Sequence, residues 1–199
     1  SMLAHQQQSV HRLLPVWSLM GNEGWCMTGY HAVSVLADAL AKGADIDRRA
    51  ALEAMTATAS SKRMPGIEAY RQLGYVPYDR DATAASNTLE YAYDDWAIYA
   101  AAKAAGETAA AEEFAKRALS YRNVYNPQSG FACPRYADGR FKEGMDPYQT
   151  YNEGFIEGNS WIFSFHVPHD VFAMMRIKKK KKVFRQRLDE LFSMDLPEK

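Results

Sequence analysis

The stretch Ser86-Asn-Thr-Leu-Glu-Tyr-Ala-Tyr-Asp-Asp-Trp-Ala-Ile-Tyr-Ala-Ala-Ala-Lys-Ala-Ala105, followed by Gly106, decides the fold class of this chain. Its apolar residues recur every three or four positions, the spacing that places side chains on one face of an α-helix. Ser86 or Asn87 is expected to cap this helix, with Glu90 at capping-box distance from Asn87. The face predicted to be buried consists of Leu89, Ala92, Trp96, Tyr99 and Ala102.

A partner helix is expected directly after the break at Gly106, over residues 107–124, with Phe114, Ala118 and Tyr121 facing inward. Two helices joined by so short a connector pack side by side as an α-hairpin. The same spacing and the helix start and stop signals predict further helices over residues 6–14, 25–42, 48–58, 67–73, 169–177 and 183–192. We therefore predict an all-α chain of helical hairpins with long loops, and one small β-hairpin around residues 131–141.

Length and composition limit the number of domains and the classes of function that the chain can have. At 199 residues it can form one substantial core, and we predict a single domain over residues 1–199 with no internal boundary. A formal net charge of zero argues against general affinity for nucleic acid, and no apolar run reaches the length of a membrane span. Cys26 and Cys133 lack metal-ligand spacing and are expected to be buried free thiols, and the lysine run 178–182 is expected to form an exposed turn.

The chemistry is expected in another stretch, Tyr151-Asn-Glu-Gly-Phe-Ile-Glu-Gly-Asn-Ser-Trp161, followed closely by His166-Val-Pro-His-Asp170. Glu157 supplies a carboxyl group, Asn159 a hydrogen-bond donor and acceptor, and Trp161 a flat apolar face. Because a sugar ring stacks on an aromatic face while a carboxyl group protonates the glycosidic oxygen, the cluster indicates a carbohydrate site. The alternative is a loop that caps a helix, with Glu157 and Asn159 as turn residues.

Four collinear matches cover almost the whole chain: Leu14-Pro-Val-Trp-Ser-Leu-Met-Gly-Asn-Glu-Gly-Trp-Cys-Met-Thr-Gly-Tyr-His-Ala32, Leu73-Gly-Tyr-Val-Pro-Tyr-Asp79, Thr88-Leu-Glu-Tyr-Ala-Tyr-Asp-Asp-Trp96, and Glu157-Gly-Asn-Ser-Trp161 with Val167-Pro-His-Asp170. They resemble signatures of glycoside hydrolase family 92, the calcium-dependent exo-acting α-mannosidases. The first departs from the family pattern, because Gly24 stands where a threonine is usual. The resemblance implies an (α/α)6 toroid, of which about three of the six hairpins can be counted here.

The resemblance also implies a reaction, the hydrolysis of a terminal α-mannose from a mannoside or N-glycan with inversion at the anomeric carbon. Such a reaction needs an acid on one side of the bond and a base-activated water on the other. The resemblance makes Glu157 the general acid, a role that needs a raised pKa, and Glu153 or Asp170 could contribute a neighbouring carboxylate. The family's general-base motif is absent, so we expect a central fragment of a catalytic domain that is inactive by itself.

Calcium is the cofactor that the resemblance implies, with ligands outside this chain. A mannose-terminated glycan is the implied partner, and a secreted or periplasmic location is the implied compartment. A partial toroid would expose apolar helix faces, so self-association is also expected.

The first matched stretch adds three candidate substrate-binding residues, Trp17, Glu23 and Trp25. A glutamate beside a tryptophan can bind sugar hydroxyl groups. For Glu23 the alternative is a helix N-terminus, where a carboxylate complements the helix dipole. Asn159 and Trp161 are likewise expected either to line the sugar site or only to position the loop.

Two other functional classes stay open at this point. One is an α-helical carbohydrate-binding or structural module without catalysis. The other is a different helical glycosidase whose two carboxylates are Glu157 and either Asp94 or Asp95. Adjacent helical residues project in different directions, so these aspartates are not expected to face one ligand together, and Asp95 is expected to pair with Trp96 in a structural hydrogen bond.

The histidines are expected to have ordinary roles. His31 is predicted to be a satisfied histidine of the core or its boundary. A zinc site at His166 and His169 with Asp170 is disfavoured, because Pro168 interrupts any helix between the two imidazoles.

Overall fold

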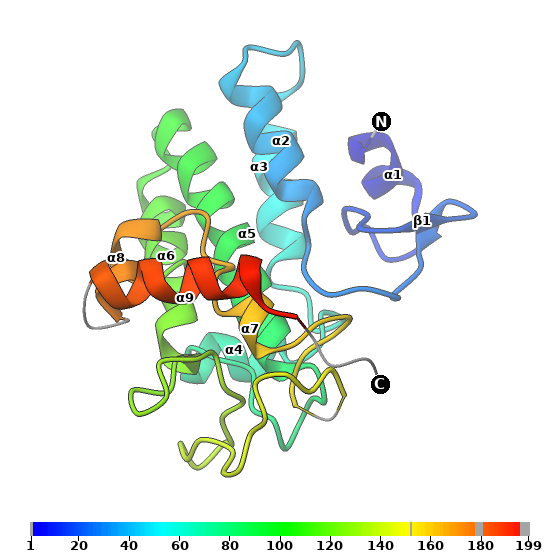
Figure 1. Cartoon of the computed structure of the whole chain (residues 1–199). Helices are drawn as coiled ribbons and strands as arrows, with labels where there is room; N and C mark the ends of the chain where they lie inside the picture. Colours follow the sequence, from blue (N-terminus) through cyan, green and yellow to red (C-terminus); the bar gives the residue numbers. More distant parts are fainter. Residues whose placement is uncertain (1, 152, 178–180, 196–199) are drawn as a thin grey trace.

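A computed structural model describes residues 2–151, 153–177 and 181–195 (Figure 1). Two short strands, β1 (Ser18–Leu19) and β2 (Asn22–Glu23), form an antiparallel hairpin. The predicted all-α class with long loops and one small hairpin is confirmed. The helices are α1 (Met2–Gln8), α2 (Ala32–Ala41), α3 (Arg48–Thr58), α4 (Ile67–Leu73), α5 (Ala84–Ala105), α6 (Thr108–Arg117), the 3-10 helix η1 (Ser120–Val124), α7 (Ser160–Phe163), α8 (Val171–Ile177) and α9 (Lys181–Ser193).

Helix α5 is the centre of the molecule and packs against α2, α3, α6 and η1. In Figure 1 α2, α3 and α5 run roughly upright, and the long loops of residues 125–151 and 153–160 gather at their lower end. Fourteen of the 22 residues of α5 are buried, so it lacks the solvated face of an amphipathic surface helix. One core cluster joins it to α2, α3, α4 and α6, and a second joins it to η1, the loops and α8. The prediction that Trp96 belongs to the buried face of this helix is wrong, since its side chain is 39% exposed.

The start of α5 differs from the prediction. The helix begins at Ala84, and Asn87 lies inside it, with its side-chain amide donating to Asp81 and Thr83. Glu90 forms no capping box. The N–H groups of Ala85 and Ser86 donate to the carbonyl of Gly154, at 3.0 and 3.2 Å. A distant loop thus satisfies the orphan donors that a side-chain cap would otherwise take.

Helix α2 begins at Ala32, so the prediction that it starts at Trp25 is wrong. Trp25 and Gly29 have φ of +53° and +82°, which no right-handed helix accommodates. The N–H of Tyr30 donates to the carboxylate of Asp94 at 2.6 Å instead of to a helical carbonyl. A contact with α5 therefore decides where α2 starts.

The first helix also ends early. The helix predicted over residues 6–14 is instead α1 (Met2–Gln8), which begins before Gln6 and stops at Gln8. Arg12 has a φ of +55°, which breaks the helix, and Leu13 and Leu14 turn into the core. The N–H of Leu14 donates to the hydroxyl of Thr58 in α3 at 3.0 Å. Burial of two leucines thus outweighs continuation of the helix.

Other helices are where the sequence predicted them. The α3 and α4 ranges are confirmed, and Asp47 caps α3 by accepting from the N–H of Ala50 at 3.0 Å. The predicted partner of α5 is present as α6 followed by η1, and its inward-facing residues Phe114, Ala118 and Tyr121 are buried. Local capping and periodicity suffice for these elements.

The β-hairpin lies elsewhere than predicted. Residues 131–141 contain no strand and take part only in isolated bridges, Tyr125 with Ala132 and Arg135 with Phe141. The observed hairpin turns at Met20 and Gly21, both with positive φ, which matches the twist of a two-residue hairpin loop. Methionine is not a usual residue at such a turn, so the sequence did not indicate a hairpin at this position.

Three further sequence expectations concern the cysteines and the lysine run. Both cysteines are free thiols, but only Cys133 is buried, and Cys26 is exposed. Lysines 178–180 lie outside the described residues. Lys181 and Lys182 begin α9, so the end of the run is helical and not a turn.

A buried charge network holds the helices together. Asp95 in α5 is fully buried and accepts from the hydroxyls of Tyr30 and Tyr70, at 2.6 and 2.7 Å. The guanidinium of Arg117 donates to the same carboxylate at 3.0 Å and to the carbonyl of Ala59 at 2.8 Å. The expected structural pair of Asp95 with Trp96 is therefore wrong. One carboxylate instead joins α4, α5, α6 and the segments that flank α2 and α3.

Replacement of Asp95 by asparagine is expected to destabilise the chain by about 3–5 kcal/mol, because it leaves the buried Arg117 charge without its partner. Urea unfolding followed by circular dichroism measures the change. Asp38→Asn is the matched control, since Asp38 pairs with Lys42 on the surface and should change stability by about 0–1 kcal/mol. Equal effects of both variants would contradict the role of the Asp95 network.

Candidate functional site

The loop that carries Glu157 is fixed to the first turn of α5. The carbonyl of Gly154 accepts the N–H groups of Ala85 and Ser86, and the N–H of Ile156 donates to the hydroxyl of Ser86 at 3.1 Å. A Cβ atom on Gly154 would lie 2.4 Å from Cγ of Pro134, so only glycine permits this approach. Hydrogen bonds therefore hold the loop on both sides of buried Phe155, immediately before the candidate acid.

Glu157 itself is exposed and has a φ of +50°. A residue other than glycine in the left-handed region costs about 1–2 kcal/mol, and such strain is concentrated at functional sites. In the part of the chain that the structure describes, no side chain forms a hydrogen bond or ion pair with its carboxylate. The geometry thus presents a free carboxyl group at a strained position on an anchored loop.

The two carboxylates considered as neighbours of Glu157 are each paired with a cation. Glu153 accepts from Nζ of Lys142 at 2.7 Å, and both side chains are largely buried. Asp170 accepts from the hydroxyl of Tyr121 and from Arg122, at 2.7 and 3.1 Å. Hydrogen bonds from these two groups lower the pKa of Asp170 against the opposing effect of desolvation, the largest single cause.

Asn159 and Trp161 position the loop. Asn159 caps α7 by accepting the N–H of Ile162 at 3.2 Å. The Trp161 ring is buried, edge-on to Phe131 with ring centroids 4.8 Å apart and near Tyr148 at 5.9 Å. These contacts favour the loop-positioning alternative for both residues over direct contact with a sugar.

Trp17, Glu23 and Trp25 lie on and beside the β1–β2 hairpin. The carboxylate of Glu23 accepts the backbone N–H groups of Val16, of Trp17 at 3.1 Å and of Trp25 at 3.0 Å. Glu23 thus binds a loop and not a helix N-terminus, because α2 starts nine residues further on at Ala32. Both indoles remain exposed, so their rings are accessible to a ligand.

Sequence reasoning missed a polar cluster on α5, called here the Glu90 cluster and formed by His31, Glu90, Asp94 and His166. Oε2 of Glu90 lies 2.9 Å from Nε2 of His166 and 3.3 Å from Nε2 of His31. Nδ1 of His31 lies 2.7 Å from the buried carboxylate of Asp94. Each residue stands in a matched stretch or beside one, but only the tertiary fold brings them together.

The electrostatics of the Glu90 cluster favour a cationic His31. Burial lowers the pKa of this imidazole, but the hydrogen bond to Asp94 and the negative charges of Asp94 and Glu90 outweigh burial and raise the pKa from 6.5 to about 9. His31 therefore carries a positive charge at neutral pH between two carboxylates. It lies at the boundary of the core, as predicted.

Asp94 and Asp95 project in different directions, as predicted for adjacent helical residues, and they share only Tyr30, which gives its backbone N–H to Asp94 and its hydroxyl to Asp95. Both are fully buried, Asp94 against Tyr30 and His31 and Asp95 against the Arg117 network. An enclosed carboxylate cannot activate a water at an open cleft. The structure thus argues against either aspartate as the catalytic partner of Glu157.

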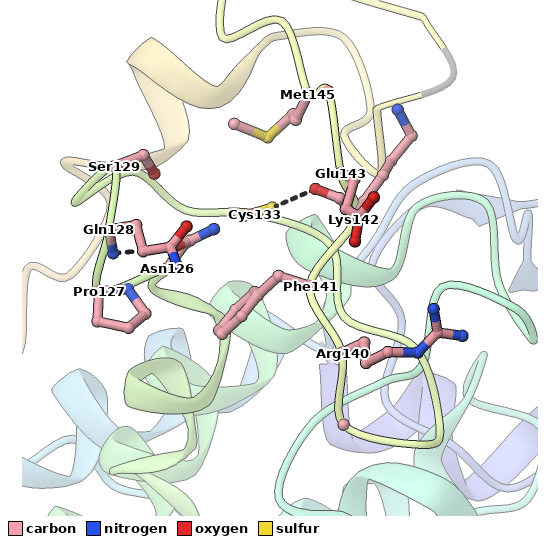
Figure 2. A pocket seen from close by; sticks show the side chains of 12 residues that line it. Asn126, Pro127, Gln128, Ser129, Cys133, Arg140, Phe141, Lys142, Glu143 and Met145 are labelled. Carbon is pink, nitrogen blue, oxygen red and sulfur yellow. Dashed lines mark hydrogen bonds between the residues drawn. The ribbon is translucent and has the colours of Figure 1, made fainter.

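A cleft of about 530 Å³ lies between the loops of residues 126–129 and 139–145 (Figure 2). Figure 2 shows Phe141 at its base and Lys142, Glu143 and Met145 along one side. Cys133 also lines the cleft, and burial raises the pKa of its thiol to about 11, so it is protonated at neutral pH. Glu157 is not among the lining residues, so this cleft is separate from the candidate acid.

Within residues 2–151, 153–177 and 181–195, no three or more His, Cys, Asp and Glu side chains gather so as to hold a metal ion. His166 contacts Glu90, whereas Nε2 of His169 bonds the carbonyl of Ala118 at 2.9 Å. None of the described helices is both long and apolar enough to cross a membrane.

Comparison with solved structures identifies the architecture. An α-mannosidase of family GH92 from Bacteroides thetaiotaomicron is 42% identical, with a TM-score of 0.93 over 99% of this chain and 26% of its own. It has also been solved in complex with mannoimidazole. An inverting mannosidase of the same family and organism is 33% identical, with a TM-score of 0.89 over 96% of this chain and 26% of its own.

A curated relative from Arthroderma benhamiae, an uncharacterized secreted glycosidase, is 25% identical over 87% of this chain and 27% of its own length. The chain thus spans about a quarter of the relatives that it matches. Its helical hairpins form part of the (α/α)6 toroid found in these glycosidases. Residues 1–199 match the Glycosyl hydrolase family 92 catalytic domain, and the chain belongs to this family.

Replacement of Glu157 by glycine is expected to stabilise the chain by about 0.5–1 kcal/mol, because glycine adopts the left-handed backbone without strain. Thermal or urea unfolding measures the difference. Glu143→Gly is the matched control, an exposed glutamate whose φ is not positive, and it should not stabilise the chain. A loss of stability in Glu157→Gly equal to that of the control would show that residue 157 bears no strain.

Proposed function

We propose that the protein containing this chain is an inverting exo-α-mannosidase, and that Glu157 is its general acid. Glu157 protonates the glycosidic oxygen as the bond to a terminal α-mannose breaks, while a water attacks the opposite face of the ring. The observation that carries the proposal is the exposed, unpaired carboxylate at φ +50° on a loop bonded to α5. Membership of glycosyl hydrolase family 92 supports this assignment.

The carboxylate that activates the water is proposed to lie outside this chain. Asp94 and Asp95 are enclosed, and Glu153 is paired with Lys142. The chain matches only 26% of the Bacteroides α-mannosidase, which leaves ample length for the base and for calcium ligands. We therefore propose that residues 1–199 alone do not hydrolyse mannosides, and that N-glycans are substrates of the whole protein.

Two further properties belong to this proposal. The likeness to a secreted glycosidase supports a location outside the cytoplasm. Exposed apolar side chains, among them Met20, Phe172 and Phe192, support self-association of the isolated chain, which light scattering would detect as species larger than a monomer.

Mannoimidazole is the probe for the role of Glu157, because its imidazole nitrogen accepts the proton that a general acid donates. Calorimetric titration is expected to show binding to chain 1–199, weakened about tenfold or more in Glu157→Gln. The control Glu143→Gln should bind as the wild type does. Equal binding by Glu157→Gln would overturn the assignment and favour a carbohydrate-binding module.

Hydrolysis supplies the complementary measurement. Chain 1–199 is expected to release no 4-nitrophenol from 4-nitrophenyl α-mannopyranoside above the rate in buffer, because no base activates the water. Release that Glu157→Gln abolishes would contradict the proposed location of the base outside this chain.

A further inference from the structure

We propose that the Glu90 cluster and the exposed indole of Trp96 form a second sugar-binding subsite, one helical turn from the loop of Glu157. The subsite would bind hydroxyl groups of one hexose through Glu90, His31 and His166 and receive the face of the adjoining hexose on Trp96, which lies beyond the Tyr93 ring. This inference rests on the proposed function, because it takes a mannose-containing glycan as the ligand.

Two independent contacts place the Glu90 cluster beside the Glu157 loop. Ile156 donates to Ser86, and Glu90 lies four residues further along α5, about one turn or roughly 6 Å along the axis on the same face. A Cβ atom on Gly158 would lie 2.9 Å from the ring of Phe163, so the backbone after Glu157 lies against this ring.

The Phe163 ring continues the second contact to the cluster. Its centroid lies 6.2 Å from that of His166, edge to face, and His166 binds Glu90. The residues before Glu157 are therefore bonded to α5, which carries Glu90, and the residues after Glu157 pack on Phe163, which contacts His166. A glycan bound at Glu157 would therefore extend onto the Glu90 cluster.

The polar atoms of the cluster suit a pair of sugar hydroxyls. Both imidazoles contact Oε2 of Glu90, and Oε1 has no hydrogen-bond partner in the described part of the chain. The Glu90 side chain is 14% exposed, while His31 and His166 are 37% and 34% exposed. A carboxylate oxygen accepts from one hydroxyl and a cationic imidazole donates to its neighbour, which is a charge-assisted arrangement.

An aromatic face completes the subsite. The Trp96 ring lies 6.4 Å from that of Tyr93 at an interplanar angle of 19°. The Tyr93 ring in turn lies 6.4 Å from His31 and 6.3 Å from His166. The Tyr93 ring thus separates Trp96 from the imidazoles, and the indole, which is 39% exposed, offers an apolar face to a second sugar next to the one that the polar groups hold.

The subsite is held rigid from inside the protein. Asp94 is fully buried, accepts the N–H of Tyr30 at 2.6 Å and orients the His31 ring. Because the core fixes Asp94, the imidazole needs no reordering when a ligand arrives. Asp94 is thus a positioning residue, and it does not contact the sugar.

The test titrates chain 1–199 with an α-linked mannobiose, long enough to span both parts of the subsite, and follows the imidazole signals of its five histidines by NMR. We expect saturable shifts of the His31 and His166 signals, with the His5 and His11 signals unchanged. Glu90→Gln should weaken the binding about tenfold or more, and Trp96→Ala about fivefold or more. Glu68→Gln and Phe172→Ala are matched controls, an exposed glutamate and an exposed aromatic away from the cluster, and should bind as the wild type does.

The absence of saturable shifts at His31 and His166 would overturn the subsite, as would full binding by Glu90→Gln and Trp96→Ala. Trp96 is exposed, so its variant is expected to fold even if Glu90→Gln does not. Glu157→Gln should retain the mannoside shifts. If mannoimidazole binding is unchanged in Glu157→Gln but weaker in Glu90→Gln, the assignment of Glu157 as the general acid is contradicted and the subsite is supported.

Discussion

The rest of the structure depends on the charge of Asp95, buried at the middle of α5. A buried carboxylate is stable only when its hydrogen-bonding capacity is filled and its charge is matched. Tyr30, Tyr70 and Arg117 supply these partners from three separate segments. The arginine also bonds the carbonyl of Ala59, so the end of α3 is tied to the same point. Any movement of these helices would expose or unpair the charge.

The residues of the candidate site are connected to the same helix by a series of contacts, one helical turn apart. Asp94, the neighbour of Asp95, orients His31, and His31 contacts Glu90 one turn earlier along α5. Ser86, one turn earlier again, binds the loop that presents Glu157. Catalytic geometry requires positions fixed within about 0.5 Å, and residues on or bonded to a buried helix meet that requirement better than a free loop does. The strained backbone at Glu157 is tolerated because the loop is anchored beside it.

Predictions from the sequence succeeded where the deciding interactions are local. The α3 helix is set by its own cap, Asp47, and α4 ends at Gly74, whose φ of +78° suits glycine. They failed where a distant residue decided the structure. Tyr30 leaves the helical path because its N–H binds Asp94, 64 residues away, and the start of α5 is satisfied by Gly154.

The sequence by itself determined the helical class, the family through its matched stretches, and Glu157 as the candidate acid. These follow from spacing, capping and short motifs, which are local properties of the chain. Only the tertiary structure decided that Glu157 is exposed at a positive φ, that Trp161 is buried, and that His31, Glu90 and His166 meet. The physical reason is that packing of helix on helix and pairing of buried charges act between segments that the sequence does not place in contact.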